Sequence, residues 1–412
     1  MRICVFTLGC KVNQSESDSL IKDLKSLGHE VVDELSFCDL YIVNTCAVTG
    51  EAEKKSRQTY ARILAINPNA KIIYTGCASQ KDPESFAKKS DSVLVTGTFN
   101  KGEIISLLDK TGLSLFPESK AFEELSTPES LRTRTYVKIQ DGCNNFCSYC
   151  IIPYLRGRSR SRNSDKIVEE IAKINSPEVV LGGIDISSYN DNGVTLTGLI
   201  NKLRGTVSRI RIGSFEVGVI NDELLTALKN LKDFAPHFHL SLQSGCDEVL
   251  KKMNRRYTTS EYLEKVNLIR KYFPNAGITT DIIVGFPTET EENAFATLEF
   301  VKEVAFSDIH PFPYSHRTGT VASKLIDING DVKKARLNKL IELKKQLKNE
   351  FLEKNVGNVV RVLFETDENG YFAGYSENYI RVYAKGDNLA DKTIKEVKII
   401  KTLFDGVLGE II

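Results

Sequence analysis

Three cysteines within one short run constrain this chain more than any other feature. The run CNNFCSYC places them at Cys143, Cys147 and Cys150, directly after a strand-like apolar run, TYVKIQ. Three thiolates at this spacing can hold three irons of a 4Fe-4S cluster and leave the fourth iron open. The amino and carboxylate groups of S-adenosylmethionine can chelate such an iron. The alternatives are a zinc site or three buried thiols, but zinc normally takes four ligands and no histidine lies near this segment.

Three further cysteines each follow a strand-like run, and these runs lie about one β-α unit apart. RICVFTL, DLYIVNT and KIIYTG are followed by Cys10, Cys46 and Cys77. In a parallel α/β sheet the carboxyl ends of the strands share one edge, so three strands can present three thiolates to one cluster. Taken singly, each cysteine would more often be a small buried residue, but their shared position after strand-like runs favours a cluster. The remaining cysteines lack this placement and are assigned to core or surface: Cys4, Cys38 and Cys246.

The chain divides into three segments of different pattern, as its length leads us to expect. Residues 1–112 alternate strands and helices, which predicts a parallel α/β domain. Over 133–354, six strand-like runs separated by helical patterns predict a partial (β/α)6 barrel followed by a Lys-rich helix. Over 355–412, the runs VVRVLFE, GYFAGYS, YIRVYA and EVKIIKTLF predict a small antiparallel β-barrel. Residues 111–134 form the connecting segment, and the fold class is α/β.

Charge gives only local support to nucleic-acid binding, because the formal net charge is +1. Between Arg132 and Lys166, however, eight Lys or Arg stand against two Asp, where substrate phosphate could dock. Arg156 and Arg162 are the chosen substrate-binding candidates, although this segment could also be a solvated loop. We find no secretion signal and no apolar stretch of membrane-spanning length, and therefore expect a cytoplasmic protein without a membrane partner.

Several motifs together resemble one known family over nearly the whole chain. TLGCKVNQ, NTCAVT, TGCASQ, DGCNNFCSYCIIPYLRGRSRSR, LQSG and TDIIVGFPTET resemble the methylthiotransferase family of radical S-adenosylmethionine enzymes. TLGCKVNQ most resembles the branch that acts on N6-threonylcarbamoyladenosine in tRNA. The resemblance implies an N-terminal cluster domain, a radical S-adenosylmethionine barrel and a C-terminal TRAM domain, which fits the three segments.

The resemblance also implies the chemistry. Cys143, Cys147 and Cys150 are expected to hold the cluster that cleaves S-adenosylmethionine, and Cys10, Cys46 and Cys77 an auxiliary 4Fe-4S cluster that carries the transferred sulfur. The expected reaction converts N6-threonylcarbamoyladenosine beside the anticodon to its 2-methylthio derivative, with a flavodoxin- or ferredoxin-like reductant and a sulfur donor as partners. The alternative substrates are isopentenyladenosine in tRNA and a ribosomal-protein aspartate. A noncatalytic iron-sulfur RNA-binding protein is the alternative from another class.

Six further residues at strand ends are the candidates for binding S-adenosylmethionine. Absence of a Cβ at Gly182 and Gly183 would let the backbone approach a cofactor, although both could be plain turn glycines. Glu216 and Gln243 could hydrogen-bond the cofactor or cap the next helix. Gly285 and Pro287 match the adenine-contacting segment of the family. The chain departs from the family's usual residues at Gly182, Asp185, Val217 and Thr288.

A threonylcarbamoyl group carries a carboxylate, so a site that selects it should contain a cation. Lys11 is the candidate, because it directly follows Cys10 and the isopentenyl branch typically has Gln there. Lys11 could instead point outward at the start of a helix, in which case Arg361 or Arg381 could serve.

Overall fold

The computed structural model describes residues 1–127, 133–386, 389 and 392–412, so part of the predicted connecting segment (128–132) lies outside the described residues. The chain forms two compact units. The first unit comprises Met1–Glu170, Gly182–Gly193 and Ser315–Ser323, and the second comprises Ile171–Leu181, Val194–Tyr314 and Lys324–Ile412. These units divide the chain differently from the predicted segments 1–112, 133–354 and 355–412. All six cysteines assigned to clusters belong to the first unit.

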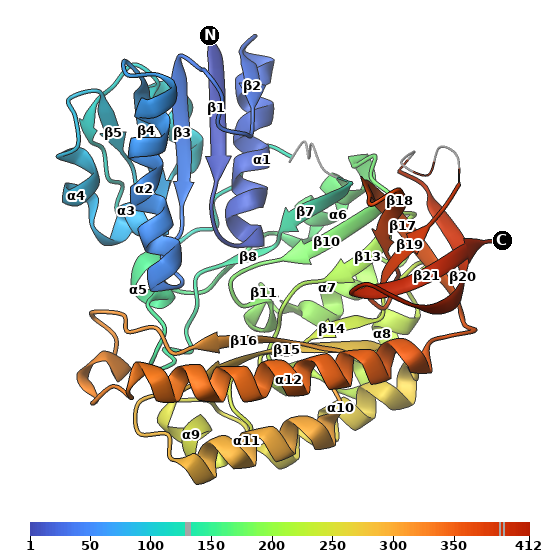
Figure 1. Ribbon diagram of the computed structural model, residues 1–412. Coiled ribbons are helices and arrows are strands. Elements are labelled where there is room, and N and C mark those ends of the chain that lie inside the picture. The colour runs from blue at the N-terminus through green and yellow to red at the C-terminus, as the bar shows by residue number, and fades with distance from the viewer. Residues whose placement is uncertain (128–132, 387–388, 390–391) are drawn as a thin grey trace. The chain divides into compact units, whose positions relative to one another are not determined.

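A six-stranded parallel sheet forms the core of the first unit (Figure 1). Its strand order is β2-β1-β3-β4-β5-β6, and the bounds are β1 (Arg2–Thr7), β2 (Glu30–Val32), β3 (Leu40–Thr45), β4 (Lys71–Gly76), β5 (Val93–Val95) and β6 (Gly112–Leu113). The three predicted strand runs form β1, β3 and β4. Every residue of β3 is buried, as expected of a parallel strand with helices on both faces of its sheet.

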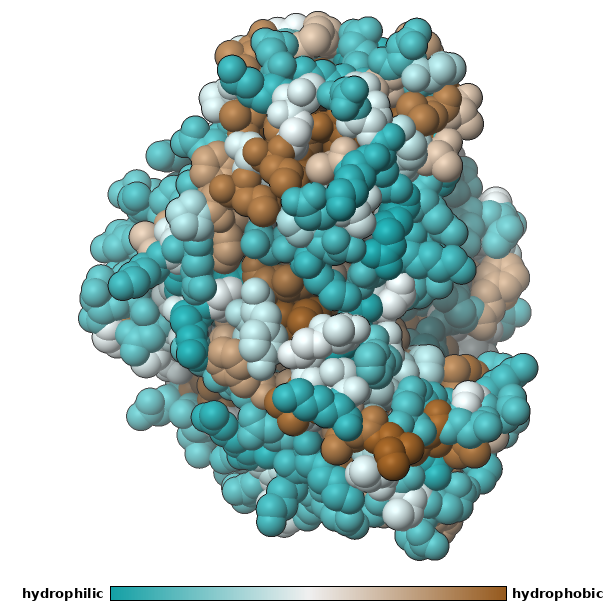
Figure 2. Space-filling view, turned by 90° about the vertical axis from the view of Figure 1, so that its left-hand side faces the viewer, coloured by the Kyte–Doolittle hydropathy of each residue, from teal (hydrophilic) through white to brown (hydrophobic). Residues whose placement is uncertain are grey.

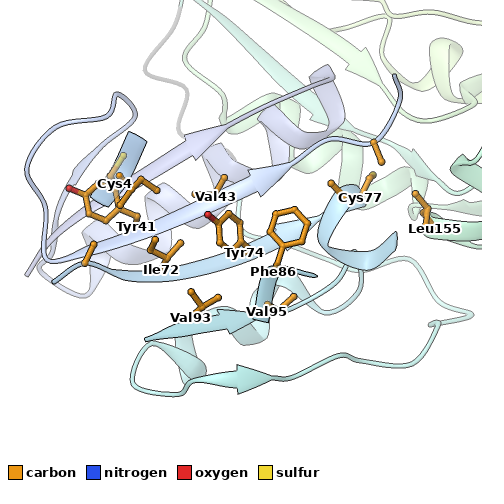
Figure 3. Packing of buried hydrophobic residues seen from close by; sticks show 14 of the residues in the cluster. Cys4, Tyr41, Val43, Ile72, Tyr74, Cys77, Phe86, Val93, Val95 and Leu155 are labelled. Atoms are coloured by element: carbon orange, nitrogen blue, oxygen red, sulfur yellow. The ribbon is translucent and has the colours of Figure 1, made fainter. Parts of the chain in front are cut away.

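Helices cover both faces of this sheet. On one face, α1 (Lys11–Ser26) and η1 (Lys101–Leu107) pack against apolar residues of β1 and β3. On the other lie α2 (Gly50–Ile66), α3 (Cys77–Lys81) and α4 (Pro83–Ala87). Of the two places left open for them, core or surface, Cys4 and Cys38 take the core, fully buried among the hydrophobic residues of this second face. Figure 3 labels Cys4. Since α1 and α2 take opposite faces, the carboxyl ends of β1 and β3 form a switch point, where α/β sheets bind ligands.

The remaining elements of the first unit are short. They are β7 (Arg134–Lys138), β8 (Gln140–Asp141), α5 (Ile152–Arg156), β9 (Arg160–Ser161), η2 (Ile186–Ser188), β11 (Asn190–Asp191) and most of α6 (Ser164–Lys173). A further 3-10 turn, η4 (Ala322–Lys324), begins within Ser315–Ser323, the last segment of the first unit. β8 and β9 pair antiparallel, with Asp141 opposite Arg160. This pairing closes the loop that carries Cys143, Cys147 and Cys150.

Parallel strands form the first part of the second unit. Its strands are β10 (Glu178–Gly182), β13 (Arg209–Ile212), β14 (His237–His239), β15 (Gly277–Val284) and β16 (Asp308–Pro313), with the two-residue β12 (Val194–Thr195). β10 pairs with β13, and β15 pairs with both β14 and β16. Single bridges, Ile210 to Phe234 and Phe215 to Leu240, join the two groups.

Helices alternate with these strands along the chain. They are α7 (Leu196–Lys202), η3 (Val217–Val219), α8 (Asp222–Lys229), α9 (Asp247–Lys252), α10 (Thr259–Tyr272), α11 (Glu291–Val304) and α12 (Gly330–Lys354). All six predicted strand runs of the central segment form strands, including β7 of the first unit. The α/β class is confirmed.

The C-terminal residues close into a five-stranded barrel in the order β17-β18-β19-β21-β20 (Figure 1). The strands are β17 (Val359–Glu368), β18 (Tyr371–Tyr375), β19 (Arg381–Ala384), β20 (Ile394–Leu403) and β21 (Gly406–Ile411). Four of them were predicted, and β21 was missed. The predicted antiparallel arrangement also needs a correction, since β19 and β21 pair in parallel. Strand directions cannot alternate throughout a closed ring with an odd number of strands.

The surface shown in Figure 2 is mostly hydrophilic, with hydrophobic residues gathered in several areas of limited extent. Among the described residues, we find no helix with the length and apolar character needed to cross a lipid bilayer.

Candidate cluster and cofactor site

A glycine in the left-handed region directly precedes one cysteine on each of three loops. The pairs are Gly9 and Cys10, Gly76 and Cys77, and Gly142 and Cys143, with glycine φ angles of 102°, 96° and 72°. A Cβ on these glycines would lie 2.6 Å from Cys46 Sγ, 2.5 Å from Thr45 O and 2.0 Å from Arg158 O, respectively. Only glycine tolerates both the dihedral angle and the close approach. These turns place the cysteines directly after the strands.

Cys10, Cys46 and Cys77 gather at the carboxyl edge of the parallel sheet. Cys10 is the N-cap of α1, and Cys46 follows β3. Cys77, labelled in Figure 3, begins α3. Burial raises the pKa of Cys46 to about 12, and the nearby thiols of Cys77 and Cys10 raise it too. No three Cys, His, Asp or Glu among the described residues are arranged to hold a single metal ion. A 4Fe-4S cluster binds each thiolate at a different iron, so three thiols from three loops at one sheet edge are a donor set of the kind that such a cluster takes.

The second cysteine set lies on the loop that β8 and β9 close. Its backbone is fixed by hydrogen bonds from Cys143 N to Gly157 O (3.1 Å) and from Cys150 N to Cys147 O (2.9 Å). Asn145 N donates to Cys143 Sγ at 3.4 Å. These bonds hold a compact loop of three partly exposed cysteines, which suits a cluster open to a small molecule.

Residues 315–323, which follow β16, contact both cysteine regions. Arg317 is buried and donates to Ala47 O, next to Cys46, and to Glu53 at 2.7 Å. Ala322 N donates to Ser148 O at 2.7 Å, within the other cysteine loop. None of the predicted site residues lies in this segment. The polar run SHRTGT, with a single arginine after the last strand of the partial barrel, is the signal that could have indicated it.

Arg156 lies in a buried charge network beside Cys77. Its side chain is 1% exposed, and its Nη1 lies 2.9 Å from Glu16 Oε1 and 3.1 Å from Asp141 Oδ1. Its Nε donates to Cys77 Sγ at 3.4 Å. Burial alone would raise the pKa of Glu16, but the adjacent Arg156, Lys101 and Lys138 hold that pKa well below its usual range. The carboxylate is therefore charged.

Arg162 is also buried and ion-paired. It lies 2.8 Å from Glu124 and 2.6 Å from Glu170. The guanidinium groups of Arg156 and Arg162 are thus surrounded by carboxylates rather than presented to a phosphate. Arg158, in contrast, is exposed.

Two of the cofactor candidates lie in the first unit. Gly182 ends β10, and a Cβ there would meet no atom within 4 Å, so open space lies beside it. A Cβ on Gly183 would lie 2.9 Å from Gln140 O. Gly182 therefore leaves room for a ligand. At position 183, close packing against Gln140 accounts for the glycine.

The other four candidates lie in the second unit. Glu216 makes no helix-capping hydrogen bond and instead pairs with Arg255 at 2.6 Å. Gln243 has a φ of 71° and exchanges backbone hydrogen bonds with β15. Gly285 has a φ of 68° and donates its N–H to Glu289, and the buried Pro287 lies two residues beyond it.

Comparison with known proteins identifies the family to which this chain belongs. Residues 137–301 match the Radical SAM superfamily, and residues 2–97 match the Uncharacterized protein family UPF0004. The Bacillus subtilis protein named threonylcarbamoyladenosine tRNA methylthiotransferase MtaB is 36% identical over 97% of this chain and 94% of its own length. The Aquifex aeolicus protein of the same name is 37% identical over 96% and 99%. The chain belongs to the radical SAM methylthiotransferase family.

Solved structures show the same fold for this methylthiotransferase. The radical S-adenosylmethionine methyltransferase TsrM from Kitasatospora setae has a TM-score of 0.56 at 13% identity and covers 78% of this chain and 77% of its own. The cobalamin-dependent S-adenosylmethionine radical enzyme OxsB has a TM-score of 0.54 at 13% identity, over 84% of this chain and 56% of its own. Membership of the radical SAM family implies S-adenosylmethionine and a 4Fe-4S cluster as cofactors.

The methylthiotransferase presents Lys11 at the start of α1. Lys11 is exposed, and its Nζ lies 5.8 Å from the centre of the Tyr136 ring. The two alternative cations are already paired, Arg361 with Asp233 at 2.6 Å and Arg381 with Asp405 at 3.3 Å. Each of these two arginines would have to give up an ion pair in order to bind a substrate carboxylate.

Proposed function

We propose that this enzyme is a tRNA methylthiotransferase that converts N6-threonylcarbamoyladenosine beside the anticodon to its 2-methylthio derivative. The observation that carries the proposal is the presence of two sets of three cysteines on separate loops of one compact unit. The names of relatives that are 36–37% identical over nearly the full length support the substrate. A Clostridium novyi relative named tRNA-2-methylthio-N(6)-dimethylallyladenosine synthase is also 37% identical, over 88% of the chain. Identity alone therefore does not separate the two substrates.

Each cysteine set has its own proposed role. Cys143, Cys147 and Cys150 hold the cluster whose open iron binds S-adenosylmethionine, and the space beside Gly182 receives part of that cofactor. Glu216, Gln243, Gly285 and Pro287 are proposed contacts to the same cofactor. Cys10, Cys46 and Cys77 hold a second 4Fe-4S cluster, which supplies sulfur when bound. The buried thiols suit this role, because the low exposure of Cys46 and Cys77 protects a cluster from water and oxidants.

The C-terminal barrel is a proposed contact surface for the tRNA. Phe404 is 63% exposed and packs against the buried Tyr383, with ring centres 5.3 Å apart, and Tyr371 completes this aromatic group. Arg381 and Lys385 lie over two of these rings. Aromatic rings beside cations bind unpaired bases by stacking. This local group supports an RNA contact, although acidic residues outnumber basic ones from Val356 onward, nine to seven.

The proposed reaction also sets requirements for partners. Reductive cleavage of S-adenosylmethionine needs an electron, so we propose a flavodoxin- or ferredoxin-like reductant. Transfer of sulfur from a cluster needs a donor that replaces it. A cytoplasmic location agrees with a tRNA substrate.

The decisive experiment is nucleoside mass spectrometry of tRNA from cells that lack the gene. We expect 2-methylthio-N6-threonylcarbamoyladenosine to disappear and its unmethylthiolated precursor to accumulate. Plasmid-borne wild-type gene should restore the product, and a Cys147→Ala variant should not. Loss of methylthiolated isopentenyladenosine instead, or loss of methylthiolation of a ribosomal protein, would assign the enzyme to another branch. No 5′-deoxyadenosine from the purified, reduced protein would favour a noncatalytic role.

Lys11→Gln tests the proposed carboxylate contact. We expect kcat/KM for threonylcarbamoylated tRNA to fall about 10- to 100-fold, because loss of a charge-assisted hydrogen bond costs roughly 1.5–3 kcal/mol. Iron content and 5′-deoxyadenosine formation without tRNA should stay unchanged. The matched control is Lys25→Gln, at the other end of α1. Unchanged kcat/KM in Lys11→Gln would remove Lys11 as the reader of the substrate carboxylate.

A further inference from the structure

The buried charges around Arg156 are unequal in number. The buried cations are Arg156, Lys101, Lys138 and Arg160, whereas the buried carboxylates are Glu16 and Asp141. A third carboxyl group, Glu123, lies nearby, and burial raises its pKa. Even with Glu123 charged, the cations exceed the carboxylates by one. Among the groups that contact Glu16 and Asp141, cations are therefore in excess, which favours an anion beside Arg156.

The guanidinium of Arg156 is held in one orientation. Nη1 bonds Glu16 and Asp141, and Nη2 donates to Asn13 Oδ1 at 2.6 Å. Asn13 is itself fixed, because its Nδ2 donates to Leu8 O and Thr45 O at 2.9 and 3.0 Å. With both terminal nitrogens engaged, the remaining Nε–H points at Cys77 Sγ. The side chain therefore presents a single N–H, at Nε, to the sulfur of Cys77.

We propose that Arg156 is a positioning residue of the auxiliary cluster: its Nε–H bonds the Cys77 thiolate, and the excess of buried positive charge compensates the anionic cluster. This inference rests on the proposed function of Cys10, Cys46 and Cys77. Hydrogen bonds to ligand sulfur and nearby positive charge stabilise the reduced, more negative state of a cluster, so they raise its reduction potential. Arg156 thereby sets how readily this cluster accepts an electron.

The test uses the full-length chain with Cys143, Cys147 and Cys150 replaced by alanine, so that only the auxiliary cluster forms. Arg156→Lys keeps the charge, but a single ammonium cannot bond Glu16, Asp141 and Cys77 together. We expect its midpoint potential, measured by redox titration with electron paramagnetic resonance, to become more negative. A tenfold change in the ratio of reduced to oxidised cluster is the expected size, which for one electron is about 59 mV.

Two further variants make the result decisive. Arg162→Lys is the matched control, because Arg162 is also a buried, ion-paired arginine and the partners of its guanidinium are carboxylates, and the potential of this variant should not change. The double variant Arg156→Gln with Glu16→Gln removes one charge of each sign, and should lower the potential or lose iron at a temperature at which its circular dichroism spectrum shows that it is still folded. Full iron content with an unchanged potential in both Arg156 variants would overturn the inference. If the chain with Cys143, Cys147 and Cys150 replaced by alanine takes up no iron, the auxiliary cluster itself is refuted.

Discussion

Gly142→Ala is expected to abolish loading of the cluster at Cys143, Cys147 and Cys150. Gly142 has a φ of 72°, and a Cβ would lie 2.0 Å from Arg158 O, a backbone atom that β8 and β9 hold in place. The loop must therefore open, and the three thiols separate. Iron content after anaerobic reconstitution should fall from about eight per chain to about four, and 5′-deoxyadenosine formation should be lost.

Gly193→Ala separates the steric clash from simple backbone strain. Gly193 has a φ of 95°, but a Cβ there would meet no atom within 4 Å. This variant should lose only about 1 kcal/mol of stability and keep both its iron and its activity. Normal iron uptake by Gly142→Ala would mean that the loop adapts without losing its geometry.

Glu16→Gln should destabilise the first unit strongly. Glu16 is 1% exposed in its side chain and pairs with Arg156 and Lys138 at 2.9 and 3.0 Å, as well as with Lys101. Removing the charge leaves buried cations without a partner, which costs about 3–5 kcal/mol. For a unit of this size, the midpoint of thermal unfolding should fall by about 10 °C. Circular dichroism of the reconstituted protein, heated under argon, measures this unfolding midpoint.

An exposed ion pair provides the control for this loss of stability. Glu84 lies 3.8 Å from Lys88, one helical turn away, with side chains 62% and 77% exposed. Glu84→Gln should shift the midpoint little, because exposed pairs contribute at most about 1 kcal/mol. If both variants unfold at the same temperature as the wild type, the charges around Glu16 do not stabilise the fold as described.

The strands and the cysteine placement could be predicted because they depend on local pattern. A buried parallel strand is a continuous apolar run, and the turn after it puts the next residues at the sheet edge, as Cys46 after β3 illustrates. β21 was missed because GVLGEI is short and contains two glycines, and its partners are fixed only when the barrel closes.

The roles of the arginines could not be predicted from a count of charges. Arg156 pairs with Glu16, 140 positions earlier in the sequence, and Arg162 pairs with Glu124 and Glu170. A local excess of +6 indicates a basic surface only when no acidic residue from elsewhere folds onto it. The partners of Arg156 come from α1 and β8, so their proximity is a property of the tertiary structure.

The contacts of residues 315–323 impose an order on biosynthesis. A growing chain presents Cys46 and Cys147 to the cell long before it contains Arg317 and Ala322, which complete the surroundings of both cysteine loops. Domains fold from the N-terminus as they leave the ribosome, so the sheet can form early while its cysteine edge is still incomplete. Ala47 and Ser148 therefore gain these hydrogen-bond partners only after most of the chain has been made.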